Sequence, residues 1–258
     1  MRVLVTGGAQ GLGAALVQAF AARGDDVLAA DVAFPADGAS ATGMHLDVRS
    51  DDDWAAARAR VEEQWGGLDV LVNNAGVAGG GRIDVADLDE WRWITEINLF
   101  GVVRGTRTFT PVFKQQRSGH IVNVASLAGL VHPAGMGSYN AVKAAVVAFS
   151  ETTAHELAGH GVRCSVVCPS YFRTGLVDRM QGRDTAVGAV IGALVEAAPL
   201  GPDDIAAAVL EGMDRGEELI LPDEAARAAY QLKVTDRAAY DAVMRKQAAR
   251  LEAMGAAE

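Results

Sequence analysis

The sequence predicts an α/β protein: a doubly wound, seven-stranded parallel sheet flanked by helices on both faces. The first observation is that short β-branched runs alternate with longer amphipathic segments along the 258 residues. The second is that the runs VLV, VLVN and IVNVA are apolar almost throughout, as expected for strands covered on both faces. Strands and helices in this alternation are joined by right-handed crossovers, so we expect a Rossmann-like arrangement.

The individual elements are predicted in chain order from these patterns. Strands are expected at residues 2–5, 26–31, 44–47, 68–73, 120–125, 162–167 and 219–221. Helices are expected between them, at residues 11–22, 51–65, 88–113, 138–159 and 202–215. No linker and no repeat interrupts this order, so residues 1–258 are expected to form a single domain.

Two segments depart from the alternation. Residues 170–198 follow the sixth strand, have Gly and Arg interspersed, and are expected to form a helical flap. Residues 223–258 are rich in Ala and in charges, and are expected to form one or two terminal helices. We expect this extension to pack against the domain or against a neighbouring subunit.

The composition excludes several classes of protein. The formal net charge is −10, from 23 basic and 33 acidic residues, so phosphate backbones are repelled and no nucleic-acid partner is expected. No apolar run reaches the ~18 residues of a membrane span. The N-terminal MRVLVTGG enters a strand at once and leaves no room for a signal peptide. We therefore expect a cytoplasmic protein without a membrane partner.

The two cysteines support a reducing compartment. Cys164 and Cys168 lie in one strand-like run, where four residues separate their Cα atoms by roughly 13 Å. A disulfide needs less than about 7 Å, so the two thiols are expected to stay unpaired. No cluster of ligands has the spacing of a zinc site, and no metal is expected.

The stretch TGGAQGLG follows the first strand and opens the first helix, which is the context that a dinucleotide-binding glycine motif requires. Gly7 is expected to adopt a turn conformation, Gly11 to admit a pyrophosphate, and Gly13 to let the helix lie close to the sheet. Phosphates bound there meet the positive end of the helix dipole.

Asp31 ends the second strand and bears on the choice of cofactor. Its carboxylate is placed to accept both hydroxyls of an adenosine ribose and to repel a 2′-phosphate. No Arg or Lys lies within residues 6–13 or directly after Asp31, so NAD is expected rather than NADP. The alternative is a solvated Asp at the end of a strand.

Five elements in order match one family: TGxxxGxG at residues 6–13, NNAG at 73–76, Asn98, Ser126, and the YxxxK pair of Tyr139 and Lys143. Over residues 2–221 the sequence resembles the short-chain dehydrogenase/reductase family in its compact form. The resemblance implies an oxidoreductase that moves a hydride between nicotinamide and a secondary alcohol or ketone. It also implies a homo-oligomer, either a tetramer or a dimer.

The resemblance implies that Tyr139 is the general acid/base and that Lys143 holds the nicotinamide ribose. Lys143 lies one turn after Tyr139 on the same helix face, about 6 Å along the axis. Its ammonium, together with the positive nicotinamide ring, is expected to lower the tyrosine pKa from its usual value of about 10. The alternative is a surface Tyr/Lys pair on an amphipathic helix.

Ser126 and Asn98 complete the implied catalytic set. Ser126 ends the fifth strand, at the sheet edge where the crevice lies, and its hydroxyl is expected to stabilise the substrate oxygen. A helix-capping Ser is the alternative, but the LAGLVHPAG that follows is not expected to start a helix. Asn98 is implied to lie in a kinked helix and to reach Lys143 through a water, with a solvent-facing Asn as the alternative.

The remaining cofactor contacts also come from the resemblance. Asp47 resembles the Asp that contacts the adenine, with Val48 beside it, and Thr174 is expected to hold the nicotinamide amide. Ser170 stands where the family has a glycine, so this turn is expected to be strained or to differ. The full predicted cofactor set is Gly7, Gln10, Gly11, Leu12, Gly13, Asp31, Asp47, Val48, Asn74, Ala75, Gly76, Tyr139, Lys143, Pro169 and Thr174.

The substrate pocket is expected to be apolar and partly aromatic, which favours an apolar or cyclic secondary alcohol. Arg173 leaves a carboxylated substrate open, and two rival functions are an NADPH-dependent carbonyl reductase and a non-catalytic dinucleotide-sensing protein. The predicted pocket residues, from the flap and from the loop before the catalytic Tyr, are His132, Met136, Tyr171, Phe172, Leu176 and Met180.

Overall fold

The structure, a computed structural model, describes residues 1–34, 43–176 and 180–255. The strands are β1 (Arg2–Thr6), β2 (Asp26–Asp31), β3 (Gly43–His45), β4 (Val70–Asn73), β5 (Gly119–Val124), β6 (Val162–Val167) and β7 (Leu219–Ile220). The helices are α1 (Gly11–Ala22), α2 (Asp51–Trp65), α3 (Leu88–Thr95), α4 (Gly101–Gln116), α5 (Ala128–Val131), α6 (Gly137–Ala158), α7 (Thr185–Glu196), α8 (Pro202–Asp214), α9 (Glu224–Thr235) and α10 (Arg237–Gly255), with a π-helical turn, η1 (Glu96–Phe100), between α3 and α4.

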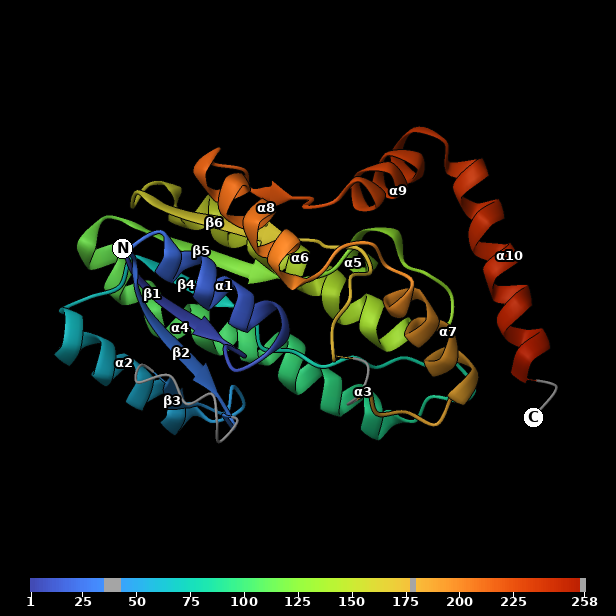
Figure 1. Cartoon of the computed structure of the whole chain (residues 1–258), viewed down its shortest axis with the longest axis horizontal. Coiled ribbons are helices and arrows are strands. Elements are labelled where there is room, and N and C mark those ends of the chain that lie inside the picture. The colour runs from blue at the N-terminus through green and yellow to red at the C-terminus, as the bar shows by residue number, and fades with distance from the viewer. Residues whose placement is uncertain (35–42, 177–179, 256–258) are drawn as a thin grey trace.

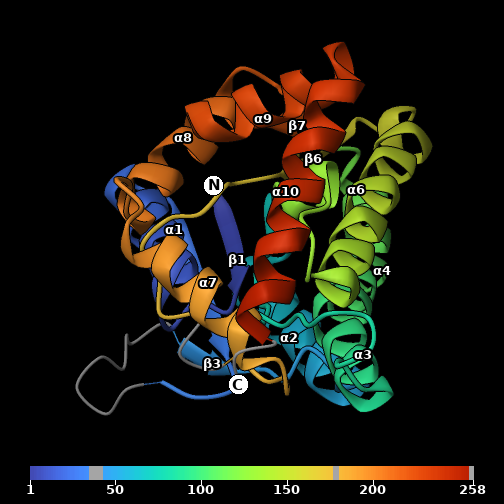
Figure 2. The ribbon, with the colours of Figure 1, turned by 90° about the vertical axis from the view of Figure 1, so that its right-hand side faces the viewer.

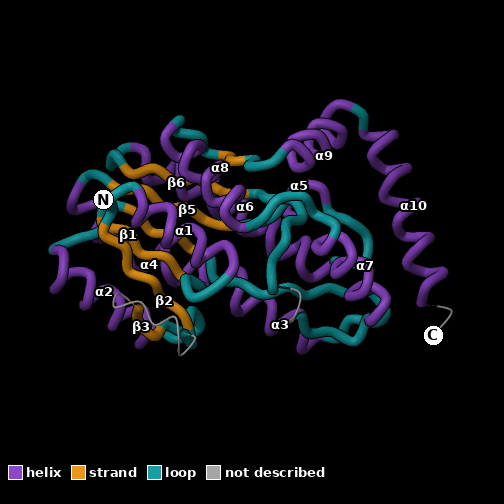
Figure 3. Tube along the Cα trace, viewed as in Figure 1, coloured by secondary structure: helices purple, strands orange, loops and turns teal. Residues whose placement is uncertain are grey.

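The strands form one sheet in the order β3-β2-β1-β4-β5-β6-β7, and neighbouring strands are parallel (Figures 1 and 3). This confirms the predicted seven-stranded, doubly wound sheet. The strand order reverses beside β1, and in such sheets ligands bind beyond the carboxyl ends of the strands at that point.

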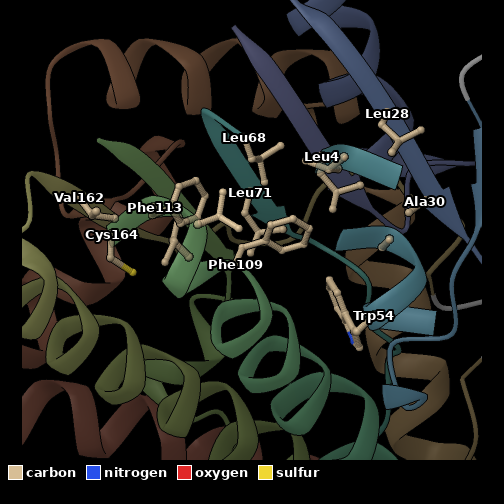
Figure 4. Packing of buried hydrophobic residues seen from close by; sticks show 14 of the residues in the cluster. Leu4, Leu28, Ala30, Trp54, Leu68, Leu71, Phe109, Phe113, Val162 and Cys164 are labelled. Atoms are coloured by element: carbon tan, nitrogen blue, oxygen red, sulfur yellow. The ribbon is translucent and has the colours of Figure 1, made fainter. Parts of the chain in front are cut away.

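Each face of the sheet is covered by its own helices. One apolar cluster joins the sheet to α1 and α8 through side chains such as Leu16 and Val209. The cluster on the other face joins it to α2, α4 and α6, and Figure 4 shows part of it around Trp54 and Phe109. These two rings meet edge to face with centroids 6.5 Å apart, and the Trp54 indole N–H donates to Val48 O at 3.1 Å. The sheet is therefore held rigidly between two layers.

Some predicted boundaries shift for local reasons. The fourth strand starts at Val70 rather than at residue 68, because Leu68 N and O bond to the side chain of Gln116. The helix predicted at 88–113 consists of α3, the π turn and α4, and it extends to Gln116. The predicted strand at 44–47 is β3, at Gly43–His45.

The two segments that depart from the alternation lie at the end of the molecule farthest from the N-terminus (Figure 1). The flap contains α7, whereas residues 177–179 within it lie outside the described part of the chain. The C-terminal extension forms two helices, α9 and α10 (Figure 2). No helix within the described ranges is long and apolar enough to cross a membrane.

Candidate active site

Residues from the carboxyl ends of β1, β2, β4, β5 and β6 surround one cavity of about 820 Å³. Among the described residues, every predicted site residue lines this cavity except Asn98, His132 and Met180. The glycine motif, the strand-end carboxylates and the Ser/Tyr/Lys set therefore open into a single space.

The loop between β1 and α1 makes the floor of one end of the cavity. Gly7 has φ +64°, which L-residues with a side chain rarely adopt. A Cβ on Gly13 would lie 1.9 Å from Gly7 O, so only glycine lets the first turn of α1 approach the loop. Asn74 fastens the end of β4 to this loop by donating from Nδ2 to Thr6 O at 2.9 Å. The result is a cradle of backbone at the N-terminus of α1 that fits a pyrophosphate.

Asp31 is bonded into this cradle and is not merely solvated. Its Oδ2 accepts from Ala9 N at 3.1 Å, and its Oδ1 accepts from Val32 N at 2.8 Å. The carboxylate faces the cavity from the end of β2, and its remaining lone pairs can accept further hydroxyl donors.

Arg49 is a basic residue near Asp31 in space although it is not near Asp31 in the sequence. The fold brings it from the loop after β3 into the same cavity wall, where the sequence predicted no Arg or Lys. Its Nη2 lies 2.6 Å from Asp47 Oδ2 and its Nε donates to Asp47 Oδ1 at 2.9 Å. The guanidinium holds the pKa of Asp47 below its usual range. A cation therefore lies at the adenosine end, although it is already paired.

Tyr139 and Lys143 lie on α6 and are buried, with 9% and 5% of their surfaces exposed. Lys143 Nζ lies 5.7 Å from the Tyr139 ring centroid and donates to Val124 O at 3.0 Å. Ser126 lies two residues after the end of β5, and its hydroxyl acts on Tyr139 as a hydrogen-bond partner that lowers the tyrosine pKa. The alternative of a surface Tyr/Lys pair is wrong, because both side chains are buried at the cavity wall.

The predicted lowering of the tyrosine pKa is not what the protein groups alone produce. Burial raises the pKa of Tyr139 to about 12, and the Ser126 hydrogen bond only opposes this rise. Burial likewise lowers the pKa of Lys143 to about 8. In both cases the first cause is desolvation, which disfavours the charged form of a buried group. Ionising Tyr139 therefore requires further positive charge at the site.

Ser126 has a second role that the sequence argument rejected. Its Oγ accepts from Ala128 N at 3.1 Å, and a short helix, α5, does start there. The expectation that LAGLVHPAG starts no helix is therefore wrong. Because a hydroxyl can accept and donate at once, the same oxygen can accept from the first N–H of α5 and donate into the cavity.

Asn98 lies behind the wall and not at the surface. It is fully buried in η1, where its Nδ2 donates to Val77 O at 2.9 Å and its Oδ1 accepts from Val77 N at 2.8 Å. The solvent-facing alternative is wrong. The amide fixes the backbone of Val77, which lines the cavity, and the water-mediated link to Lys143 stays a prediction.

Ser170 is accommodated without the expected strain. Among the described residues, only Arg117 and His132 are non-glycine residues with positive φ, so Ser170 avoids the left-handed region. Its N donates to Asp223 Oδ2 at 2.9 Å and its Oγ donates to Asp223 Oδ1 at 2.6 Å. Asp223 also caps α9. The loop after β6 is thus tied to the start of the C-terminal extension.

The predicted substrate residues separate into two groups. Met136 and Tyr171 line the cavity together, and the Tyr171 hydroxyl donates to Met136 Sδ at 3.7 Å. Phe172 also lines it but packs on the α1/α8 side of the sheet. His132 is wrong as a pocket residue, because its Nδ1 turns to Lys233 Nζ at 2.9 Å on α9. Met180 packs beside the cavity without lining it.

Several wall residues were missed by the sequence analysis. Arg49 has a local signal, since it follows Asp47 by two residues. Others lie on α3, η1, α7 and α10, and their helical spacing alone does not say which space they face. These include Trp93, Ile97, Ile191, Leu194, Val195, Met244 and Gln247.

The donor set of the cavity fits a dinucleotide. The backbone cradle suits phosphates, Asp31 suits a ribose, and the apolar wall near Tyr139 suits a flat ring. Within the described ranges, no three His, Cys, Asp or Glu residues cluster as metal ligands. Cys164 and Cys168 are free and buried, as predicted.

Comparison with known proteins gives the family of this arrangement. The short chain dehydrogenase family model matches residues 1–184. The 3-alpha-(or 20-beta)-hydroxysteroid dehydrogenase of Mycobacterium bovis is 37% identical over 182 residues, covering 68% of this chain and 70% of that protein. A short chain dehydrogenase/reductase from Burkholderia phymatum in complex with NAD has a TM-score of 0.83 at 31% identity, over 91% of this chain and 93% of that one. A short chain dehydrogenase from Burkholderia cenocepacia J2315 in complex with NADP has a TM-score of 0.79 at 27% identity, over 94% and 96%.

Proposed function

The chain belongs to the short-chain dehydrogenase/reductase family, and from this premise we propose that it is an NAD-linked dehydrogenase of neutral secondary alcohols. It is an oxidoreductase that acts on CH–OH groups and uses a nicotinamide dinucleotide. The observation that carries the finer proposal is that Ser126, Tyr139 and Lys143 open into the same cavity as Asp31 and the glycine cradle.

The chemistry proposed for this chain is the movement of one proton. Nicotinamide, when bound, supplies the hydride acceptor and a positive ring. Tyr139 Oη takes the proton of the substrate hydroxyl, and Ser126 Oγ donates a hydrogen bond to the same substrate oxygen. Lys143 provides the nearest ammonium to the tyrosinate, and its pKa of about 8 keeps much of it charged at neutral pH.

A neutral substrate is supported by the charges around the cavity. Among the described lining residues, the charged side chains other than Lys143 are Asp31, Asp47 and Arg49, all at the adenosine end. Arg173, which left a carboxylated substrate open, instead donates from Nη1 to Ala198 O at 2.7 Å. The apolar wall and the hydroxysteroid relative both favour a cyclic alcohol. Assembly as a cytoplasmic dimer or tetramer stays a prediction of the sequence.

A second candidate function is NADPH-dependent carbonyl reduction. Arg49 lies at the adenosine end, where a 2′-phosphate would compete with Asp47 for its guanidinium. One structural relative was solved in complex with NADP. We favour NAD because Asp31 faces the same region with two negative oxygens and no cation bonded to it in the described residues.

The proposal is tested by NADH absorbance with a panel of secondary alcohols, and by thermal stabilisation with NAD and with NADP. Tyr139→Phe is expected to lower turnover by at least about a hundredfold while NAD still stabilises the protein. The matched control is Tyr171→Phe, which removes a phenol from the same cavity without removing the proton acceptor. Turnover retained by Tyr139→Phe would remove Tyr139 from its role.

A further inference from the structure

The C-terminal helix α10 presents a single face to the rest of the molecule. Tyr240, Met244, Gln247 and Leu251 are spaced by four, three and four residues, so they share one side of the helix. Most other residues of α10 are exposed, including Val243 at 50%. The helix is therefore a surface element whose buried stripe is only one residue wide.

Both ends of this stripe are fastened to the domain. Tyr240, 5% exposed, belongs to the apolar cluster of Leu130, Val131 and Val147. Leu251, 3% exposed, belongs to the cluster of Met136 and Val187. A Cβ on Gly135 would lie 2.8 Å from Leu251 Cδ1, which shows how closely the helix is packed there. Figure 2 shows α10 running across this side of the molecule.

The preceding helix strengthens the first attachment. Lys233 on α9 donates from Nζ to Leu130 O and contacts His132 Nδ1 at 2.9 Å. At the start of α9, Asp223 is bonded to Ser170 of the cavity wall. The extension is thus connected to the cavity at its beginning, along α9 and at the end of α10.

Between the two attachments, Met244 and Gln247 line the cavity itself. They face the same space as Ile191, Leu194 and Val195 of α7, which forms the neighbouring wall. Leu194 lines the cavity and is still 41% exposed, so this wall lies at the surface of the molecule.

Gln247 places a polar amide in a part of the cavity wall that is mainly apolar. The described side chains on this side of the cavity are mainly apolar, and the other amide there is the exposed Gln181 on the flap. Within the described part of the chain, the Gln247 side chain has no protein hydrogen-bond partner. An amide in that position can donate to or accept from an oxygen of a bound molecule.

We propose that α10 is the outer wall of the substrate site: Met244 sets the largest ring system admitted, and Gln247 binds a second oxygen of a neutral, bulky alicyclic alcohol. The inference rests on the proposed function, since it assumes that the reacting carbon lies at Tyr139. It assigns substrate choice to an extension that lies outside the residues 1–184 matched by the family model.

The size limit is tested with Met244→Trp. The ratio of kcat/KM for decahydro-2-naphthol to that for cyclohexanol is expected to fall at least about tenfold, because the larger ring meets the indole first. Val243→Trp is the matched control, since the neighbouring side chain points to solvent, and the ratio is expected to stay unchanged. An equal change for both alcohols, or the same shift in the control, overturns the proposal.

The polar contact is tested with Gln247→Leu, which keeps the size of the side chain. We expect kcat/KM to fall roughly three- to tenfold for a decalin alcohol carrying a second, remote hydroxyl, which is the value of one neutral hydrogen bond. The kcat/KM for the alcohol without that hydroxyl is expected to stay unchanged. The control is Gln231→Leu on α9, which is expected to change kcat/KM for neither alcohol. Equal losses for both alcohols overturn the role of Gln247.

Failure of the proposed dehydrogenase function can be distinguished from failure of the proposed role of α10. If the unmodified protein oxidises none of these alcohols, the dehydrogenase proposal fails. The wall is then tested by thermal stabilisation with decahydro-2-naphthol, which Met244→Trp is expected to abolish and Val243→Trp to preserve. Stabilisation that Met244→Trp leaves intact overturns the wall independently of any turnover.

Discussion

The adenosine end and the substrate end of the cavity are built in different ways. The adenosine end is polar and is made of short segments at the ends of neighbouring strands, including Gly7, Asp31 and Asp47. The substrate end is mainly apolar and gathers Trp93 from α3 with side chains of α7 and α10, which are far apart in the sequence.

The difference reflects what each end has to recognise. A dinucleotide has fixed phosphates and hydroxyls, which backbone N–H groups and one carboxylate can bind, so the geometry of the sheet edge determines this end. A substrate varies in size, and apolar walls on helices can change without moving Ser126, Tyr139 or Lys143. The comparison predicts that substitutions at the two ends have separable effects.

The largest expected effect is on cofactor choice. Asp31→Ala removes the carboxylate that we propose repels a 2′-phosphate and accepts ribose hydroxyls. The preference for NAD over NADP is expected to narrow about tenfold to a hundredfold, the value of a charged hydrogen bond, measured as the ratio of kcat/KM values. The relative rates on different alcohols are expected to stay the same.

Asp31→Asn is the matched variant, because it keeps an acceptor for Ala9 N while removing the charge. This variant is expected to weaken the binding of NAD less than Asp31→Ala does. An unaltered preference for NAD over NADP in both variants would show that a group other than Asp31 selects the cofactor, and the other described charged side chains at this end of the cavity wall are Arg49 and its partner Asp47.

The second prediction concerns the link between the loop after β6, which lines the cavity, and the C-terminal extension that forms part of the substrate end. Asp223 is 4% exposed and accepts from Ser170 N, Ser170 Oγ and Ala226 N. Asp223→Ala is expected to lower the free energy of unfolding by about 2–3 kcal/mol, since it removes a helix cap and leaves buried donors unsatisfied. Chemical denaturation measures this loss.

Asp236→Ala is the control for capping alone. Asp236 accepts from Ala239 N at 3.0 Å near the start of α10 but is exposed, so a loss of only about 1 kcal/mol is expected. Equal losses in the two variants would mean that the Ser170 contact adds nothing to the stability, and that the C-terminal extension is not held by the loop after β6.

The smallest expected effect is on the pH dependence of stability, through the buried Glu90. Glu90 on α3 is buried and accepts from Ser138 Oγ at 3.3 Å, one residue before Tyr139. Burial raises its pKa. Between the unfolded and the raised folded pKa, only the folded state keeps the proton, so stability falls as pH rises through that window.

Glu90→Gln is therefore expected to stabilise the protein at neutral pH by no more than about 1 kcal/mol, with the gain vanishing on acidification below the unfolded pKa. Asp87→Asn should act with the opposite sign, because the hydrogen bond from Glu90 N lowers the pKa of Asp87. Thermal unfolding across pH measures both. A gain for Glu90→Gln that does not depend on pH would contradict the burial argument.

Much of the fold follows from local sequence signals. The helices at Gly11–Ala22 and Asp51–Trp65 agree with the prediction to the residue, and the ends of the second carry clear local signals. Ser50 caps the second by accepting from Asp53 N, and Gly66 ends it with φ +68°. Where a boundary depended on a distant partner, as at Leu68 beside Gln116, the prediction was wrong.

The sequence by itself determined the family, the sheet and the cavity residues that lie at strand ends and in the glycine loop, because strand ends and glycine turns are local features. Only the tertiary structure decided that burial raises the pKa of Tyr139 to about 12. It alone brought Arg49 beside Asp47, tied Ser170 to Asp223 and laid Met244 against the cavity. The physical reason is common to these: desolvation and packing depend on neighbours in space, which spacing along the chain does not specify.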